Sequence, residues 1–255
     1  MARRSEGRVA LVTGGARGIG EATAERLAED GVAIAIADLN GDGAEETASR
    51  IADRHGVRAI GLKANVTVTA EVDSIVEETA LRLGSLDILV NNAGIIRDNL
   101  IYKMTDEDWD AVATVHLKGA FLCSRAAQRE MVKRGWGRIV NLSSTSALGN
   151  RGQANYAAAK AGLQGMAKTL AIELGRYGIT VNAVAPGFID TEMTRSVATR
   201  LRRDLEEWQQ EMATQIPVRR LGVPRDIANV IAFLCSDEAS FVSGQVIYVA
   251  GGPSG

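Results

Sequence analysis

Short apolar runs alternate along this chain with segments of helical length, and this alternation limits the fold more than any single motif does. Each run stays apolar from end to end, as in VALV at 9–12. Strands of this kind are buried on both faces, which is typical of a parallel sheet covered by helices. Strands are therefore predicted at Val9–Val12, Val32–Ala37, Arg58–Leu62, Leu86–Val90, Arg138–Leu142, Ile179–Ala185 and Gln245–Val249.

The repeated strand–helix order predicts an α/β fold, a doubly wound, Rossmann-like domain on a seven-stranded parallel sheet with helices on both faces. The 255 residues contain no Pro- or Ser-rich linker and no internal repeat, so residues 1–255 are expected to form a single domain. Helices are predicted at Ile19–Asp30, Ala44–His55, Glu71–Leu83 and Ala111–Met131, the last preceded by an N-cap at Thr105.

Composition and charge exclude several classes of function. The net charge is −2 and the pI is near 5.8, so no basic field attracts nucleic acid. Cys123 and Cys235 lack a CxxC spacing, which suits a reducing, cytoplasmic compartment. His55 and His116 cannot form a metal cluster, so no metal is expected. No signal peptide precedes the first strand and no apolar run approaches the length of a membrane span, so no membrane partner is expected.

A glycine-rich turn, TGGARGIG at 13–20, joins the first predicted strand to the first predicted helix. Glycines let the backbone approach a pyrophosphate, and the free N–H groups of a helix N-terminus attract its charge. The spacing is Gly-x-x-x-Gly-x-Gly and not the Gly-x-Gly-x-x-Gly of the commonest dinucleotide fold. The turn predicts a dinucleotide site at the start of the helix.

Asp38 ends the second predicted strand, 18 residues beyond Gly20. A carboxylate there can accept hydrogen bonds from the adenosine ribose hydroxyls and repels a 2′-phosphate. NAD(H) is therefore expected in preference to NADP(H), although Arg17 can help to hold a phosphate and leaves NADP(H) possible. The alternative is that Asp38 is a helix-capping or turn residue before Asn40-Gly41 and does not bind the cofactor.

The third and fourth predicted strands also end in short side chains. Asn65, followed by Val66, can reach the edge of an adenine. The sequence NNAG at 91–94 leaves room for a cofactor at the carboxyl edge of the sheet, where such folds bind ligands. The same four residues also suit an ordinary loop after a strand.

Tyr156 and Lys160 lie four residues apart in the Ala-rich segment YAAAK, which is expected to be helical. Residues at this spacing share one face of a helix. A neighbouring positive charge favours the ionised form of a tyrosine. The pair, with a serine hydroxyl upstream, can therefore protonate a carbonyl oxygen or deprotonate an alcohol while a hydride moves.

These motifs together resemble the short-chain dehydrogenase/reductase family over nearly the whole chain. They comprise TGGARGIG at 13–20, Asp38, NNAG at 91–94, the serine pair at 143–144, YAAAK at 156–160 and PG at 186–187. Within the family, GIIRDN at 94–99, GNRGQANYAAAKAG at 149–162 and VNAVAPGFIDTEMT at 181–194 are most similar to 3-oxoacyl-acyl-carrier-protein reductases.

The resemblance implies an NAD(P)-dependent oxidoreductase acting on CH–OH donors, with Tyr156 as general acid or base. It implies that Lys160 lowers the pKa of Tyr156 and binds the nicotinamide ribose, and that a serine orients the carbonyl. It further implies a homotetramer and a small-molecule or 3-oxoacyl thioester substrate, carried on acyl carrier protein or CoA. The expected cofactor-binding residues are Gly14, Arg17, Gly18, Ile19, Gly20, Asp38, Leu39, Asn65, Val66, Asn92, Ala93, Gly94, Tyr156, Lys160, Pro186, Gly187, Ile189 and Thr191.

Two positions depart from the family pattern. His116 stands where the family has an asparagine whose main-chain carbonyl and water relay serve the lysine, and a structural or backbone-supporting role is expected for it. The family's serine lies 13 residues before its tyrosine, which gives Ser143, whereas counting along the strand from Gly137 gives Ser144. Because chain-length changes occur in loops more than in strands, Ser144 is the preferred catalytic serine.

Residues 190–217 are expected to form a substrate lid that contains a charged helix, Arg195–Met212. Met193, Trp208 and Met212 are candidates for an apolar pocket or for ordinary packing.

Two other functions stay open: an NAD-dependent dehydrogenase of another secondary alcohol, hydroxyacyl-CoA or sugar, and a non-catalytic dinucleotide-binding sensor. Three cationic side chains are candidates for contact with an acidic carrier protein, and the alternative for each is an ordinary solvated surface position: Lys133, Arg134 and Arg176.

Overall fold

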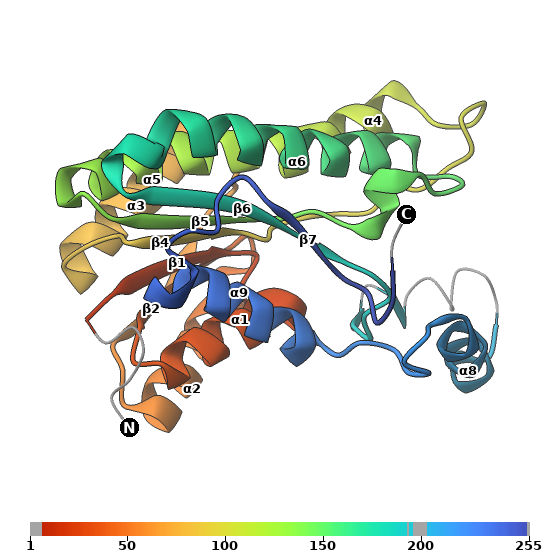
Figure 1. Ribbon diagram of the computed structural model, residues 1–255, viewed down its shortest axis with the longest axis horizontal. Helices are drawn as coiled ribbons and strands as arrows, with labels where there is room; N and C mark the ends of the chain where they lie inside the picture. Colours follow the sequence, from red (N-terminus) through yellow and green to blue (C-terminus); the bar gives the residue numbers. More distant parts are fainter. Residues whose placement is uncertain (1–6, 193, 196–202, 254–255) are drawn as a thin grey trace.

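Seven parallel strands form the central sheet of the computed structural model, which describes residues 7–192, 194–195 and 203–253 (Figure 1). The strand order is β3-β2-β1-β4-β5-β6-β7, and each neighbouring pair is parallel. The order reverses between β1 and β4, so the crevice for a ligand opens at their carboxyl ends. The strands are β1 (Val9–Thr13), β2 (Ala33–Asp38), β3 (Ala59–Lys63), β4 (Ile88–Asn91), β5 (Gly137–Leu142), β6 (Ile179–Pro186) and β7 (Val246–Val249).

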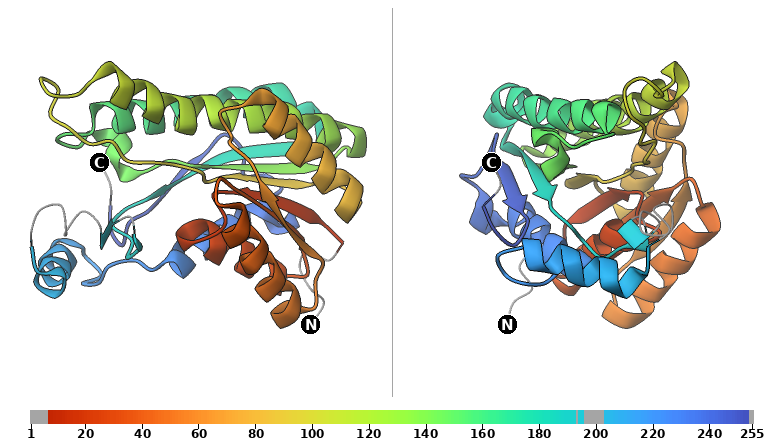
Figure 2. Two further views of the ribbon diagram at one scale, coloured as in Figure 1. Left: turned by 180° about the vertical axis from the view of Figure 1, so that it is seen from behind. Right: turned by 90° about the vertical axis from the view of Figure 1, so that its right-hand side faces the viewer.

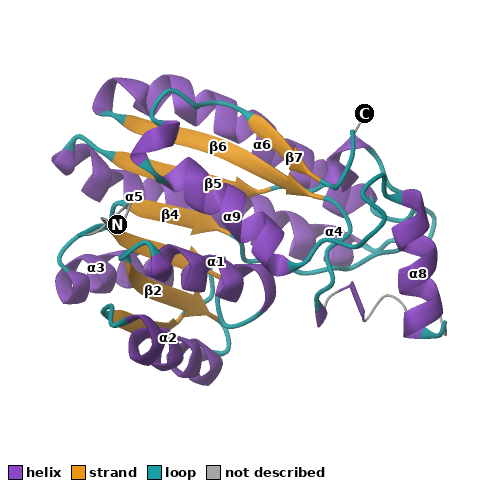
Figure 3. Cartoon of the chain, turned by 60° about the horizontal axis from the view of Figure 1, so that its bottom comes forward, coloured by secondary structure: helices purple, strands orange, loops and turns teal. Residues whose placement is uncertain are grey.

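Helices cover both faces of the sheet and confirm the predicted α/β fold (Figures 1 and 2). Strands β1 and β2 are apolar and buried apart from their last residues, a buried Thr13 and a half-buried Asp38, so each strand supplies side chains to two cores. One core lies beneath α1 (Gly18–Glu29), α2 (Gly41–His55) and α9 (Pro224–Cys235), which Figure 3 views from their side; the other lies beneath α3 (Thr69–Leu83), α5 (Gly119–Arg134) and α6 (Ala154–Leu174).

Local signals in the sequence fix several helix ends. Asn40 caps α2 by accepting a hydrogen bond from the main-chain N–H of Gly43 at 3.2 Å. Gly56 ends the same helix with φ of 67°, a left-handed conformation that glycine adopts without strain. Thr105 caps α4 (Asp106–Ala113) by accepting from the N–H of Asp108 at 3.1 Å, which confirms the predicted N-cap.

The helix predicted at Ala111–Met131 is not regular. A π-helical turn, Thr114–Lys118, separates α4 from α5 and carries His116. Such turns insert an extra residue into a helix and occur frequently at functional sites. Here the turn rotates His116 into the protein interior, where the side chain is buried.

Helix α8 (Leu205–Gln215) stands beyond the carboxyl ends of the strands, apart from the two helical layers (Figure 1). Asp204 caps it by accepting from the N–H of Glu207 at 3.0 Å. The helix predicted at Arg195–Met212 therefore differs from the structure, because an N-cap at Asp204 starts α8 later. Residues 196–202 of that prediction lie outside the described residues, as does Met193, a candidate for the apolar pocket.

Candidate active site

Tyr156 and Lys160 lie on successive turns of α6, and both contact the chain at the carboxyl end of β5. The Lys160 Nζ is 5.4 Å from the centroid of the Tyr156 ring. The Lys160 side chain is buried, and its ammonium donates a hydrogen bond to the main-chain oxygen of Leu142, the last residue of β5. The helical spacing thus brings the two groups together at the edge of the sheet where ligands bind in this type of fold.

Burial shifts both pKa values toward the neutral forms. It raises the pKa of Tyr156 to about 12. The hydrogen bond with Ser144 lowers this pKa by a smaller amount, and the charge of Asp98 raises it. Burial lowers the pKa of Lys160 to about 7. The pKa of Tyr156 is therefore raised, and the expected lowering by Lys160 is not among the causes of this shift.

The two adjacent serines have different surroundings. The Ser143 hydroxyl is buried, donates to the main-chain oxygen of Lys160 at 2.9 Å and accepts from Gln164 Nε2 at 3.0 Å. The Ser144 hydroxyl accepts from the N–H of Ser146 at 3.1 Å and hydrogen-bonds with the Tyr156 side chain. Ser144 therefore borders the tyrosine hydroxyl, whereas Ser143 fastens β5 to α6.

His116 lies behind Tyr156 and in contact with the loop that follows β4. Its Nε2 is 3.0 Å from the N and 2.8 Å from the O of Ile95, and its ring meets the Tyr156 ring edge-on at 5.1 Å. Burial, aided by the charge of Lys160, lowers the pKa of His116 to about 3, so the imidazole is neutral. A Cβ on Gly94 would lie 2.3 Å from His116 Cε1, so the loop approaches the ring as closely as glycine permits.

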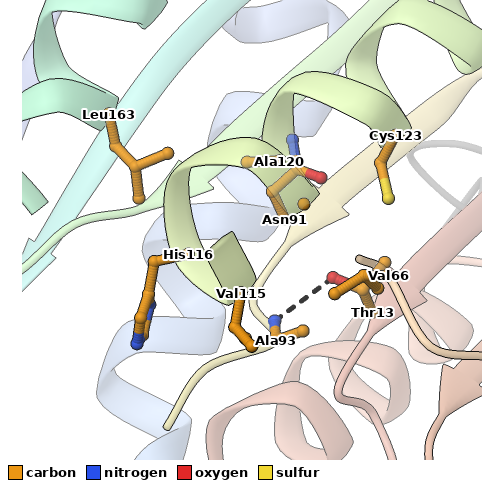
Figure 4. Close-up of a pocket in the computed structure, with 10 residues that line it drawn as sticks. Thr13, Val66, Asn91, Ala93, Val115, His116, Ala120, Cys123 and Leu163 are labelled. Atoms are coloured by element: carbon orange, nitrogen blue, oxygen red, sulfur yellow. Dashed lines mark hydrogen bonds between the residues drawn. The ribbon is translucent and has the colours of Figure 1, made fainter. Parts of the chain in front are cut away.

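A small cavity lies between the π-helical turn and the end of β4 (Figure 4). Its volume is about 10 Å³, which is near the space that one water molecule occupies. The residues on its wall include Asn91, Val66 and His116. Val66, predicted to contact a cofactor, is buried against Gly119 of α5, where a Cβ would lie 2.9 Å from Val66 Cγ2.

The glycine-rich turn forms a close-fitting backbone cradle between β1 and α1. Gly14 and Gly18 have φ of 63° and 62°, and a Cβ on Gly20 would lie 2.3 Å from the oxygen of Gly14. The Asn92 amide holds this turn by donating to the oxygens of Thr13 at 2.9 Å and Gly14 at 2.8 Å. No side chain caps α1 at Arg17, so its first N–H groups are left for an anion, which fits a dinucleotide pyrophosphate.

Asp38 touches both the glycine-rich turn and its own loop. Its Oδ2 accepts from the N–H of Ala16 at 3.2 Å, and its Oδ1 accepts from the N–H of Asn40 at 3.0 Å. Both contacts match the interpretation of Asp38 as a turn residue, and the first also places its carboxylate beside the glycine-rich turn. Leu39, next in the chain, is 67% exposed at the same edge, and Asn65 uses its side chain to cap a local turn at Thr67.

The predicted nicotinamide-binding residues of this region begin at Pro186, the last residue of β6. A Cβ on Gly187 would lie 2.8 Å from Ala250 Cβ, so Pro186 and Gly187 pass close to the chain after β7. Ile189 is buried in the core under α9 and forms an isolated bridge with Gly222. Thr191 donates its main-chain N–H to Thr194 Oγ1 at 2.9 Å.

The segment expected to be a lid is held by a carboxylate and an aromatic pair. Asp190 accepts from Arg195 Nε at 2.8 Å and from Gln209 Nε2 at 3.0 Å, and the hydrogen bond from Arg195 holds the pKa of Asp190 below its ordinary value. Trp208 is buried and meets the Phe188 ring at 5.9 Å. Of the two expected roles for Trp208, packing between α8 and the end of β6 is the one observed.

Two features of the site were not predicted from the sequence. Asp98 acts on the pKa of Tyr156 although it lies on a distant loop. Arg17 on the glycine-rich turn forms an ion pair with Glu192, at 2.5 Å. Asp98 lies within GIIRDN at 94–99, a segment that indicates the family but does not by itself assign a role to this carboxylate. No spacing in the sequence links residues 17 and 192.

The cations suited to a carrier protein have local partners. Lys133 pairs with Glu130 at 2.6 Å, and Arg134 with the buried Asp87 at 2.9 Å. The Arg176 guanidinium stacks on the ring of Tyr177, 4.7 Å from its centroid. These contacts favour the alternative of a solvated surface for all three.

The chain belongs to the short-chain dehydrogenase/reductase family of NAD(P)-dependent oxidoreductases. The matching family model, described as enoyl-(acyl carrier protein) reductase, covers residues 14–254. Curated relatives are 3-oxoacyl-[acyl-carrier-protein] reductases FabG of Aquifex aeolicus (strain VF5), 45% identical over 99% of both chains, and of Escherichia coli (strain K12), 45% identical over 97% of both. A third, 45% identical over 98% of this chain and 97% of its own, is the (2S)-[(R)-hydroxy(phenyl)methyl]succinyl-CoA dehydrogenase subunit BbsD of Thauera aromatica.

Solved structures agree with this assignment. Levodione reductase superposes with a TM-score of 0.94 at 36% identity, over 98% of this chain and 99% of its own. A putative short-chain alcohol dehydrogenase of Sinorhizobium meliloti 1021 superposes with a TM-score of 0.91 at 40% identity, over 99% of this chain and 98% of its own. Among the described residues, no helix has the length and apolar character needed to cross a membrane.

Proposed function

We propose that this chain reduces a 3-oxoacyl thioester to the 3-hydroxyacyl thioester, carried on acyl carrier protein or CoA. The arrangement that supports the proposal is Ser144 beside the hydroxyl of Tyr156, with Lys160 one helical turn away, at the carboxyl ends of the strands. Two relatives named as reductases of this substrate match over nearly the whole chain. The fold alone would not choose the substrate.

The residues present fit a nicotinamide dinucleotide. The glycine cradle and the first N–H groups of α1 would hold its pyrophosphate, and Asp38 its adenosine ribose. Lys160 would hold the nicotinamide ribose, with Asn92 and the segment 186–191 around the nicotinamide. When bound, the cofactor supplies a hydride to the substrate carbon.

In the proposed reaction the protein binds and protonates the carbonyl oxygen. The hydroxyls of Ser144 and Tyr156 donate hydrogen bonds to that oxygen and stabilise its developing charge. Tyr156 then transfers its proton to the oxygen as general acid. Lys160, whose pKa is about 7, can carry a proton at neutral pH and offset the charge left on the phenolate.

We further propose that the protein prefers NAD(H) to NADP(H), because a 2′-phosphate would meet the carboxylate of Asp38. The observation that supports this is the contact of Asp38 Oδ2 with the glycine-rich turn at Ala16. In an Asp38→Ala variant, the ratio of kcat/KM for NADH to that for NADPH should fall. An unchanged ratio would favour the purely structural interpretation of Asp38.

A second candidate is NAD-dependent oxidation of a hydroxyacyl-CoA. It is favoured by Asp38 and by the relative from Thauera aromatica, which is named as a subunit of a (2S)-[(R)-hydroxy(phenyl)methyl]succinyl-CoA dehydrogenase. Both candidates use the same residues, with Tyr156 acting as base in the oxidation. They differ in which direction and which substrate give the higher kcat/KM.

A steady-state assay of acetoacetyl-CoA with NADH and NADPH in parallel tests the proposal. Oxidation of either cofactor is expected, and a Tyr156→Phe variant should lose it while still binding nucleotide. If the wild-type protein oxidised neither cofactor, thioester reduction would be wrong. The reverse assay, with 3-hydroxybutyryl-CoA and NAD⁺, tests the second candidate, and nucleotide binding without turnover in either direction would favour the sensor.

The homotetramer, the single domain of residues 1–255 and the lid at 190–217 are proposals too. The family membership supports the first two. The position of α8 beyond the carboxyl ends of the strands supports the third (Figure 1). Light scattering of the purified protein should give about four times the 27.1 kDa of one chain.

A further inference from the structure

An ion pair links the glycine-rich turn to the segment after β6. Arg17 Nη1 lies 2.5 Å from Glu192 Oε2, and the two side chains are 77% and 75% exposed. Arg17 is the N-cap residue of α1, and Glu192 directly follows Thr191. The pair therefore joins two segments that would both border the bound dinucleotide, although 175 residues separate them.

Arg17 is the only cationic residue in the turn 13–20. A phosphate monoester carries about −1.5 to −2 charges near pH 7, so a 2′-phosphate on the adenosine ribose needs a cation nearby. Asp38, which contacts Ala16 next to Arg17, supplies a negative charge instead. The pairing with Glu192 gives Arg17 an anionic partner from the protein itself.

We propose that Glu192 is a cofactor-specificity residue that pairs with Arg17 and thereby withholds this cation from the 2′-phosphate of NADP(H). Discrimination then has two parts: Asp38 repels the phosphate, and Glu192 neutralises the cation that would attract it. The inference rests on the proposed use of a nicotinamide dinucleotide. It is independent of the thioester substrate.

A different role for the pair makes a different prediction. If the ion pair only fastened the segment after β6 over the pyrophosphate, its loss would change the affinities for NAD⁺ and NADP⁺ by the same factor. The pyrophosphate is common to both nucleotides, whereas the 2′-phosphate belongs to one. The ratio of the two dissociation constants therefore separates the two roles.

The test is isothermal titration calorimetry of NAD⁺ and NADP⁺ binding to the full chain. Glu192→Gln should lower the Kd for NADP⁺ relative to that for NAD⁺ by roughly 1.5- to 5-fold, an effect of the size of an exposed charge pair. The effect should shrink as salt is raised, because both groups are exposed. In an Arg17→Gln background, the Glu192→Gln change should leave the ratio unaltered.

A matched control is Glu211→Gln, which removes a different exposed ion pair of this region, that with Arg203 at 2.6 Å. It should leave the ratio of the two dissociation constants unchanged. An unchanged ratio in Glu192→Gln, or the same shift for both nucleotides, would overturn the inference while leaving the proposed function intact. If the wild-type chain bound neither nucleotide, the proposed function would fail and the inference with it.

Discussion

Burial sets the protonation states from which Tyr156 and Lys160 begin. With a pKa raised to about 12, Tyr156 is neutral at physiological pH and holds the proton that a general acid must give. The negative charge of Asp98 adds to this effect. The residues as arranged thus favour the starting state for reduction. Oxidation requires the phenolate, and a positive charge near the ring must then stabilise it.

The serine pair gives a prediction at the scale of single residues. Ser144→Ala should lower kcat by about 10²- to 10³-fold, because the hydroxyl beside Tyr156 would be lost from the carbonyl oxygen. Ser143→Ala should keep most of the turnover and lower the free energy of unfolding by about 1 kcal/mol, because it removes the hydrogen bond to the Lys160 oxygen. Steady-state kinetics and urea unfolding measure the two effects.

The assignment of Ser144 would be wrong if Ser143→Ala abolished turnover and Ser144→Ala did not. A Ser146→Ala variant serves as the control, since only the main-chain N–H of Ser146 bonds to Ser144. Its kcat should stay close to that of the wild type.

At the scale of elements, the π-helical turn and the loop after β4 act as a pair. The turn brings the His116 ring against Ile95 and Tyr156, and the loop can come so close only because residue 94 is glycine. Nε2 faces both the N–H and the carbonyl of Ile95, and a neutral imidazole nitrogen either accepts or donates, so it satisfies one of them at a time. The side chain therefore supports the loop behind the tyrosine.

Gly94→Ala tests this packing. The new Cβ would lie 2.3 Å from His116 Cε1, so the variant should lose about 1–3 kcal/mol of unfolding free energy. In a His116→Ala background the same change should cost clearly less, because the clashing ring is gone. Gly165→Ala in α6 is the control: its Cβ meets nothing within 4 Å, so it should stabilise the helix by about 0.5–1 kcal/mol. Equal costs of Gly94→Ala in both backgrounds would refute the coupling.

The strands and the glycine-rich turn could be predicted because their signals are local. An unbroken apolar run or a Gly-x-x-x-Gly-x-Gly spacing reports on the residues that carry it. The π-helical turn could not, because TVHLK at 114–118 carries helix-compatible residues and only the tertiary packing selects the wider turn. The start of α8 was missed because the cap at Asp204 competes with earlier charged residues for the role of N-terminus.

At the scale of the whole molecule, the site depends on contacts between residues far apart in the sequence. The pairing of Arg17 with Glu192 and the action of Asp98 on Tyr156 arise only once β1, β4 and β6 lie in one sheet. The sequence motifs predict a site at the carboxyl ends of the strands and offer two adjacent serines, of which Ser144 is preferred. Only the contacts of each hydroxyl distinguish the two serines, since both follow the same strand.

The buried ammonium of Lys160 links the stability of the whole molecule to pH. Its pKa falls from an ordinary 10.5 to about 7 on folding, so between these pH values the unfolded chain binds a proton that the folded protein has released. Stability rises with pH wherever the unfolded state binds more protons. The free energy of unfolding should therefore increase from pH 7 to 10, by at most about 1.4 kcal/mol per pH unit from this group.

Replacing Lys160 by Met should remove this increase, because an apolar side chain of similar shape has no proton to release. Urea unfolding at several pH values between 7 and 10 measures it, and this range stays below the region where Tyr156, with its pKa raised from 10.0 to about 12, would lower stability as pH rises. Lys168→Met, at an exposed position of the same helix, should keep the wild-type slope. Equal slopes in Lys160→Met and the wild type would mean that Lys160 is already hydrated and charged in the folded protein. In that case its role as a proton carrier near neutral pH would have to be abandoned.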